Sequence, residues 1–303
     1  MVIIRRNPNR IKDSREDRIF RIIVLVIVSF LFLVVLYPLV YVTSASFSSP
    51  AAINSGRVLL WPVELSLEGY KAVFSNKMIG VGYLNSVFYA VVGTSINLFL
   101  TLITAYALAC SRLPGRKAIM ILFTFTMLFG GGMIPNYILI RNLGMINTRW
   151  ALLLPGAIGV FNMIITRTFI INSIPAELQE AAEIDGCSDI QYFWYCILPL
   201  SKAVIAVITL YYAVDHWNSY FNAFLYLNDR SLVPLQIVLR DILISNTIDP
   251  NVLVDETLMA AKLGLADLLK YSLIIVSSLP VMMIYPFIQK YFIQGVMIGS
   301  IKG

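Results

Sequence analysis

The chain has 303 residues, of which 58% are hydrophobic and only 13% are charged, and its mean hydropathy is +0.79. These values exclude a soluble domain, and apolar runs near the ~18 to 20 residues that cross a bilayer recur, so we expect an all-α integral membrane protein. The net charge of +6 does not indicate a nucleic-acid partner, because the basic residues gather at the N-terminus and in short loops, where they orient a chain in the lipid bilayer.

The first predicted span, Ile22 to Val42, follows a basic segment, residues 1–21, that we expect in the cytoplasm. The span has no charged residue and is about twice as long as the apolar core of a signal peptide, so we expect it to be retained. The alternative is cleavage, since Thr43 to Ser46 weakly resembles a cleavage region. Residues 22–303 show no internal repeat or boundary of a soluble domain, which predicts a single transmembrane domain.

Five more apolar segments predict helical spans, because only helices satisfy their own backbone in hydrocarbon and the alternation of a membrane barrel is absent. They are Tyr83 to Cys110, Ala118 to about Ile138, Ala151 to about Ile171, Ala203 to about Leu225, and Tyr271 to about Ile288. With the N-terminus inside, 14 of the 23 basic residues lie on the cytoplasmic side. The sequence therefore predicts six transmembrane helices with both termini in the cytoplasm.

Two long connections then fall outside the cell, Ser44 to Gly82 and Leu227 to Lys270. Their Pro, Asn, Ser and Trp residues favour ordered surfaces that can receive an external partner. The run Gly130 to Gly132 in the third span has no lysine after it and is no phosphate loop. We expect it to permit close packing or a broken helix near the outer face.

A polar loop at about residues 172–200 separates the fourth and fifth spans on the cytoplasmic side. Ser173 and Pro175 predict the start of a helix, with Glu177 and Glu180 near the positive end of its dipole. Two alanines, Ala181 and Ala182, permit close approach of another chain, and Gly186 is expected to end the helix in a left-handed conformation.

A second short helix is predicted to start at Ser188 and Asp189 and to close at Pro199. Its apolar face is expected to lie against the membrane surface. This face comprises Ile190, Phe193, Trp194 and Ile197.

These residues resemble the signature of the membrane-spanning subunits of binding-protein-dependent ABC importers: Glu-Ala-Ala, three residues, Gly, nine residues, Ile, one residue, Leu-Pro. Glu180 to Ala182, Gly186 and Leu198-Pro199 match it at the right spacing, while Cys196 stands at the isoleucine position. The resemblance covers nearly the whole chain. Near the C-terminus, Tyr285 to Phe287 and Gly299 to Gly303 look like the maltose-type carbohydrate branch, including permeases for complex oligosaccharides or polysaccharide fragments.

The resemblance implies a type I ABC importer transmembrane-domain fold in the bacterial plasma membrane, and a carbohydrate substrate. It implies a heterodimer with a homologous second permease, two ABC ATPase subunits, and an extracellular solute-binding protein. The polar loop would be the coupling helix that sits in a cleft of the ATPase; the alternative is a loop that only anchors the helix ends at the membrane surface. The implied coupling residues are Glu180, Ala181, Ala182, Asp185, Gly186, Leu198 and Pro199.

No Gly-x4-Gly-Lys-Ser/Thr motif occurs in the chain. We therefore expect no cofactor on this chain, with ATP and magnesium bound by the partner ATPase. No nucleophile-base arrangement is apparent either, so we expect no enzyme and no catalytic residue.

The fifth span carries the polar residues that best suit a sugar pathway, because tyrosine and tryptophan stack on sugar rings while Asn and Asp bind hydroxyl groups. Asp215 lies roughly 18 Å into the helix from Ala203, beyond the bilayer midplane, where an ionisable side chain is costly unless it faces water or a partner. Alternatively, the helix is tilted and Asp215 reaches the outer headgroups. The predicted pathway residues are Tyr211, Tyr212, Asp215, Trp217, Asn218 and Asn222, with Asn85 from the second span.

The rival hypothesis is an ion-coupled secondary transporter or channel in which Asp215 and His216 carry protons. The absence of an inverted repeat argues against it. His216 is the only histidine and has no second ligand at helical spacing, and the three cysteines lack the spacing of a zinc site, so we expect no metal.

Overall fold

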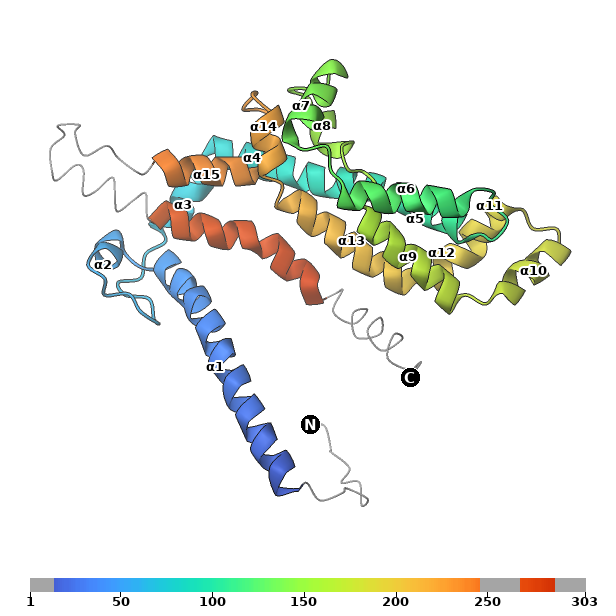
Figure 1. The fold of residues 1–303 in the computed structure, drawn as a ribbon. Coiled ribbons are helices and arrows are strands. Elements are labelled where there is room, and N and C mark those ends of the chain that lie inside the picture. The colour runs from blue at the N-terminus through green and yellow to red at the C-terminus, as the bar shows by residue number, and fades with distance from the viewer. Residues whose placement is uncertain (1–13, 246–267, 287–303) are drawn as a thin grey trace. The chain divides into compact units, whose positions relative to one another are not determined.

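The computed structural model describes residues 14–245 and 268–286, and within these ranges every regular element is a helix (Figure 1). The chain divides into two compact units, Met1–Tyr70 with Val254–Ile275 and Lys71–Leu253 with Val276–Gly303. Some predicted features lie wholly or partly outside the described residues. They are the start of the basic N-terminus, the middle part of the connection Leu227 to Lys270, the end of the last span near Ile288, and the C-terminal motif.

The first unit contains the first predicted span as the long helix α1, Arg15–Ser46. Ser14 caps α1 and forms a reciprocal capping box with Asp17. Pro38 lies inside the helix, and the apolar stretch of α1 is wholly exposed in the isolated chain. This exposure is what a helix that meets lipid or another subunit requires. The unit also holds α2, Pro50–Asn54, and the start of α3, Glu68–Ser75.

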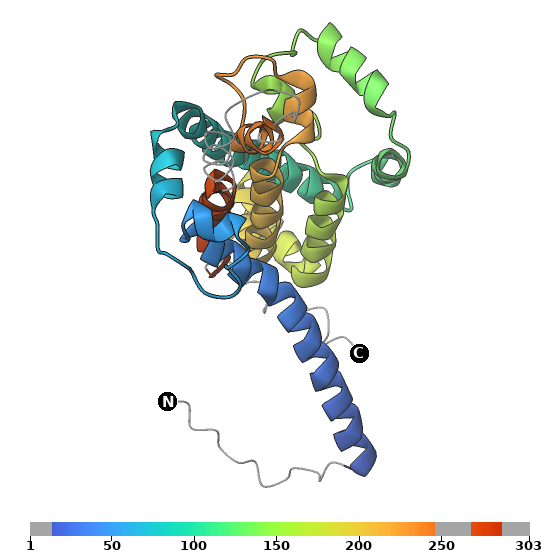
Figure 2. The same ribbon diagram turned by 90° about the vertical axis from the view of Figure 1, so that its left-hand side faces the viewer.

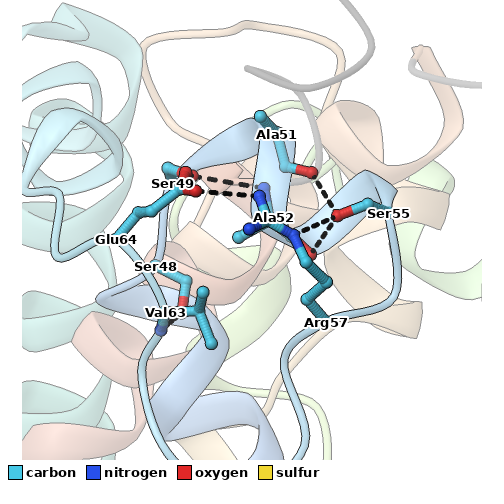
Figure 3. A network of polar contacts seen from close by, with 8 residues as sticks. All are labelled: Ser48, Ser49, Ala51, Ala52, Ser55, Arg57, Val63 and Glu64. Carbon is cyan, nitrogen blue, oxygen red and sulfur yellow. Dashed lines mark hydrogen bonds and ion pairs between the residues drawn. The ribbon is translucent and has the colours of Figure 1, made fainter.

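A network of polar side chains orders the connection after α1 (Figure 3). Ser49 caps α2 and donates a hydrogen bond to Oε2 of Glu64 at 2.6 Å, while Arg57 donates to Oε1 of Glu64 at 2.8 Å. These two contacts hold the pKa of the Glu64 carboxyl below its ordinary value. Glu64 itself has a left-handed backbone, φ +55°, so the network fixes a turn that a glutamate rarely adopts alone.

The second unit begins its membrane part with the second predicted span, one helical run from Lys77 to Ala109. It comprises α4, Lys77–Phe88, a π-helical turn η1, Tyr89–Gly93, and α5, Thr94–Ala109. A π-helical turn is rare and widens a helix locally. This one ends at Gly93, which faces the fifth span.

Three helices form the core of the second unit: α5, α9 (Val160–Ser173) and α13 (Lys202–Trp217) run side by side (Figure 1, Figure 2). Their buried side chains include Leu102, Met163 and Ile208, which are almost fully excluded from solvent. The remaining helices of this unit are α6 (Arg116–Leu128), α7 (Met133–Asn142), α8 (Trp150–Leu153), α10 (Ala176–Ile184), α11 (Asp189–Tyr192), η2 (Phe193–Ile197), α12 (Leu198–Leu200), α14 (Phe221–Tyr226) and α15 (Leu235–Ser245).

The third and fifth predicted spans are broken. The third divides into α6 and α7, which are bent by 114° at Phe129 to Gly132, so of the two roles expected of the glycine run the structure shows the broken helix. The prediction that one helix runs from Ala203 to about Leu225 is wrong, because α13 ends at Trp217 and α14 starts at Phe221.

The prediction of a continuous fourth helix from Ala151 to about Ile171 is also wrong. Pro155 and Gly156, the latter with φ +73°, separate the short α8 from α9. Proline lacks a backbone donor and the left-handed glycine leaves the helical path, so both interrupt the helix.

Three described helices are long and apolar enough to cross a membrane alone: α1, Lys77–Ala109 and Leu268–Pro286. The number rises to five if α6 with α7, and the run Asp189–Leu200 with α13, each count as one bent span. The last pair is bent by 81°. By length and composition, the fourth predicted span is the one that the described residues do not supply as a single helix, because α8 and α9 are both too short.

Candidate functional site

The first helix of the predicted polar loop, the turn after it and the start of the second helix have the backbone that their sequence indicated. Helix α10 follows Pro175 and ends at Ile184, and Gly186 has φ +75°, in the left-handed region. Ser188 then caps α11 and forms a capping box with Gln191. We call Pro175 to Ser188 the docking loop, since it is the segment that the sequence analysis expects to meet an ATPase.

One side of α10 is anchored to the second unit. Glu183 forms an ion pair with Arg112, which follows α5, and Ala182 packs against the hydrophobic core. At the start of α11, the Tyr106 hydroxyl donates a hydrogen bond to the Asp189 carbonyl at 3.4 Å. These contacts hold the docking loop against the end of α5.

Sequence reasoning missed the pair of Arg112 and Glu183. The two residues are 71 positions apart, and Arg112 was noted only as a cytoplasmic charge. The sequence offered one signal: Glu183 stands between the matched residues of the motif, at a position where the motif specifies no residue. The Oε1 atom of Glu183 is buried and has no hydrogen-bond partner among the described residues. The ion pair that Oε2 forms with Arg112 therefore offsets the cost of burying this carboxylate.

The other side of α10 points to solvent. Its exposed residues combine carboxylates with an aliphatic side chain, Ile184, that is 87% exposed. These carboxylates are free to form charge-assisted hydrogen bonds with another chain. The exposed residues of α10 and of the turn after it include Glu177, Leu178, Glu180, Ala181, Ile184, Asp185 and Gly186.

The second helix of the loop differs from its prediction. Phe193 and Ile197 are buried in the core, whereas Ile190 and Trp194 are exposed, so only two of the four residues are left to meet a membrane surface. The segment Phe193–Ile197 is the π-helical turn η2, and its buried side chains pack in the same core as α5 and α9. The helix also does not close at Pro199; it continues to Leu200 and turns at Ser201.

The seven predicted pathway residues fall into two groups. Four are exposed, namely Tyr211 and Asp215 one turn apart on α13, Asn218 directly after it, and Asn222 on α14. We call these four the exposed polar set. The other three, Asn85, Tyr212 and Trp217, are buried.

Tyr212 joins three elements. Its hydroxyl lies 2.7 Å from Oγ1 of Thr101 on α5 and accepts a hydrogen bond from the backbone N–H of Gly159, before α9, at 3.0 Å. A buried hydroxyl that is fully hydrogen-bonded stabilises helix packing. Tyr212 therefore holds α13 to α5 and α9.

We expect Tyr212→Phe to lower the stability of the protein by about 0.5–1.5 kcal/mol, because Thr101 and Gly159 lose a hydrogen-bond partner in the core. The apparent unfolding temperature of the purified protein measures this effect. The control is Tyr195→Phe, whose ring is 77% exposed. Equal unfolding temperatures for both variants would contradict the role of Tyr212.

Asn85 and Trp217 also make structural contacts. The Asn85 amide donates to the carbonyls of Ser231 and Val233 at 2.7 and 3.1 Å, and its oxygen accepts from Arg149 at 3.2 Å. The indole of Trp217 donates to the Ser277 carbonyl at 3.0 Å. Both side chains therefore have their polar atoms occupied within the chain.

His216 is buried between α13 and the second span, with Nε2 3.3 Å from Oδ1 of Asn97. Asp215 is exposed, so the two neighbours do not share one environment. Among the residues that the structure describes, no group of three His, Cys, Asp or Glu side chains is arranged to hold a metal ion.

Comparison with known proteins gives close relatives along the full length, although no family model matches the chain. It is 40% identical over 289 residues to the polygalacturonan/rhamnogalacturonan transport system permease protein YtcP of Bacillus subtilis (strain 168), covering 95% of this chain and 100% of that protein. It is 39% identical over 296 residues to Protein LplC of the same organism, covering 96% of this chain and 97% of that protein.

A solved structure is similar as well. It is the crystal structure of a bacterial ABC transporter involved in the import of the acidic polysaccharide alginate, one chain of which matches with a TM-score of 0.84. The two sequences are 36% identical, and the match covers 93% of this chain and 100% of that chain.

Proposed function

The chain belongs to the permeases of binding-protein-dependent ABC importers for oligosaccharides and polysaccharides, and from this membership we propose how its residues divide the work of transport. It is a non-catalytic, multi-pass subunit of the plasma membrane. The substrate that we propose is a polysaccharide fragment of the pectin type. Supporting this choice are the 40% identity to a polygalacturonan/rhamnogalacturonan permease and the likeness to an alginate importer.

The assembly that we propose has four kinds of subunit besides the substrate. This permease pairs with a homologous second permease, two ABC ATPases bind ATP and magnesium in the cytoplasm, and an extracellular protein delivers the carbohydrate. Residues 22–303 act as one transmembrane domain, with both termini in the cytoplasm. ATP binding then closes the ATPases and opens the cavity between the permeases outward.

The docking loop is the proposed contact with the ATPase. Its anchored side transmits motion into the core through Ala182 and the ion pair of Glu183 with Arg112. Its exposed side offers Glu180 for a charge-assisted hydrogen bond and Ala181 for close approach. Leu198 and Pro199 lie in the helix that connects the loop to α13, so they transmit the movement rather than touch the ATPase.

The exposed polar set is the proposed lining of the carbohydrate pathway. Asp215 lies in a predicted span yet is exposed on the surface of this chain, which is unfavourable against lipid and favourable against water or a polar ligand. Tyr211 adds a ring on which a sugar can stack, and Asn218 adds an amide for hydroxyl groups. The single observation that carries this part of the proposal is the exposure of Asp215 on a helix whose opposite side is buried.

We expect uptake of labelled oligogalacturonides by proteoliposomes that contain the full transporter to require both ATP at the cytoplasmic side and the solute-binding protein. The matched control replaces ATP by a non-hydrolysable analogue. Neutral galactooligosaccharides in parallel vesicles test the acidic class of the substrate, and preferential uptake of these would move the substrate to the neutral class. Uptake by this chain alone, driven by an ion gradient without ATP, would instead support the rival transporter with Asp215 and His216.

A further inference from the structure

A cavity of about 570 Å³ opens between α7, the segment that follows α8, and α14. This volume lies in the range of small-molecule sites. Two side-chain amides, Asn136 of α7 and Asn222 of α14, line it together with Tyr226. Leu143, Met145 and Pro155 contribute apolar wall.

The walls of this cavity are held together by interactions between distant segments. Asn147, with a left-handed backbone at φ +59°, donates its N–H to the Tyr226 carbonyl at 2.8 Å. Its side-chain oxygen accepts from the N–H groups of Asn228 and Asp229 at 3.0 and 2.8 Å. The ring of Tyr226 stacks on Tyr137 of α7, with centroids 6.1 Å apart. The segments that carry Asn136 and Asn222 are therefore fixed relative to each other before any ligand binds.

The chemistry of the lining selects the class of ligand. A side-chain amide both donates and accepts hydrogen bonds, which matches the hydroxyl groups of a sugar. The apolar wall suits the C–H face of a sugar ring. Among the described residues, none that lines the cavity is charged, so the site has no group that would select a carboxylate, a phosphate or an ammonium ion.

We propose that this cavity is a binding subsite for a sugar ring of the transported carbohydrate, with Asn136 and Asn222 binding its hydroxyl groups. The proposal rests on the function proposed above and adds a site. Asn222 connects it to the exposed polar set, while Asn136 belongs to α7, a part of the chain that sequence analysis did not assign to substrate. The subsite binds hydroxyl groups, which acidic and neutral sugar rings both carry, so it accepts both kinds of ring.

The test uses the full transporter in proteoliposomes with labelled oligogalacturonides, in the variants Asn136→Ala, Asn222→Ala and the double variant. We expect each single change to lower kcat/KM for uptake about 2- to 10-fold, the equivalent of one hydrogen bond, mainly through KM. Leu143→Trp, which places a large ring at the cavity wall, is expected to lower uptake as well. The matched control is Asn142→Ala, an exposed asparagine on the same helix that does not line the cavity.

A further readout separates binding from packing. The yield of assembled complex is expected to stay near wild type in all four variants. Loss of the complex in the alanine variants would assign the amides to packing and overturn the subsite. Wild-type uptake in both the double variant and Leu143→Trp would overturn it while the importer function stands. Absence of ATP-dependent uptake in the wild-type transporter, with oligogalacturonides and neutral galactooligosaccharides alike, would overturn the proposed function and the subsite together.

Discussion

Gly93→Ala is expected to destabilise the permease by about 1–3 kcal/mol, because the new methyl group overpacks the contact between η1 and α13. A Cβ atom at Gly93 would lie 2.4 Å from Nε2 and 2.5 Å from Cε1 of His216, closer than side-chain atoms approach in proteins. The imidazole is buried and its Nε2 lies 3.3 Å from Asn97, so moving it costs packing and this polar contact. The apparent unfolding temperature of the purified transporter measures this loss of stability.

A double-mutant cycle identifies His216 as the cause. In a His216→Ala background the clash is absent, so Gly93→Ala should cost markedly less than it does in the wild type. The matched control is Gly80→Ala on α4, where an added Cβ meets no atom within 4 Å. If Gly93→Ala matched Gly80→Ala, or if its cost were unchanged without His216, the packing described for Gly93 would be wrong.

Gly186→Val is expected to weaken the association of the ATPase about 5- to 30-fold. Gly186 has φ +75° and no atom within 4 Å of a built Cβ, so the substitution meets no neighbour and acts on the backbone alone. A residue with a Cβ pays roughly 1–2 kcal/mol in the left-handed region, which corresponds to that factor. The loop can relieve the cost by shifting the end of α10, and this shift displaces the exposed residues proposed to meet the ATPase. Retention of the ATPase on the tagged and purified permease gives the measurement.

Two matched variants separate the turn from general strain. Gly186→Asn should retain more ATPase, because asparagine tolerates the left-handed region better than a β-branched residue. Gly115→Val has nearly the same backbone cost, with φ +74° and open space around its Cβ, but lies before α6. We expect it to leave ATPase association near wild type. Equal loss in Gly115→Val and Gly186→Val would show that strain anywhere in the chain suffices, against a specific role of the docking loop.

Local signals in the sequence determined the class of protein and the backbone of the docking loop. Composition and apolar runs indicated an all-helical membrane protein; α1 contains the first predicted span, and the run from Lys77 to Ala109 contains the second up to its last residue. Pro175, Gly186 and Ser188 act on neighbouring residues through φ limits and caps, so helix, left-handed turn and second helix could be read without knowledge of the fold.

Tertiary structure alone decided where the fifth span breaks and which polar residues face outward. Helix α13 ends at Trp217, whose carbonyl accepts a hydrogen bond from the side chain of Gln236, a residue beyond the end of α13. A hydropathy pattern counts apolar residues and does not detect such a contact at a helix end. Hydropathy also does not reveal that the Tyr212 hydroxyl is hydrogen-bonded to Thr101 while Asp215 is exposed. Which side chains of α13 are buried depends on which helices pack against it. The pair of Arg112 with Glu183, and the meeting of Asn136 with Asn222 at one cavity, likewise join residues far apart in the chain. Contacts of this kind depend on the packing of whole helices, which no local pattern of residues specifies.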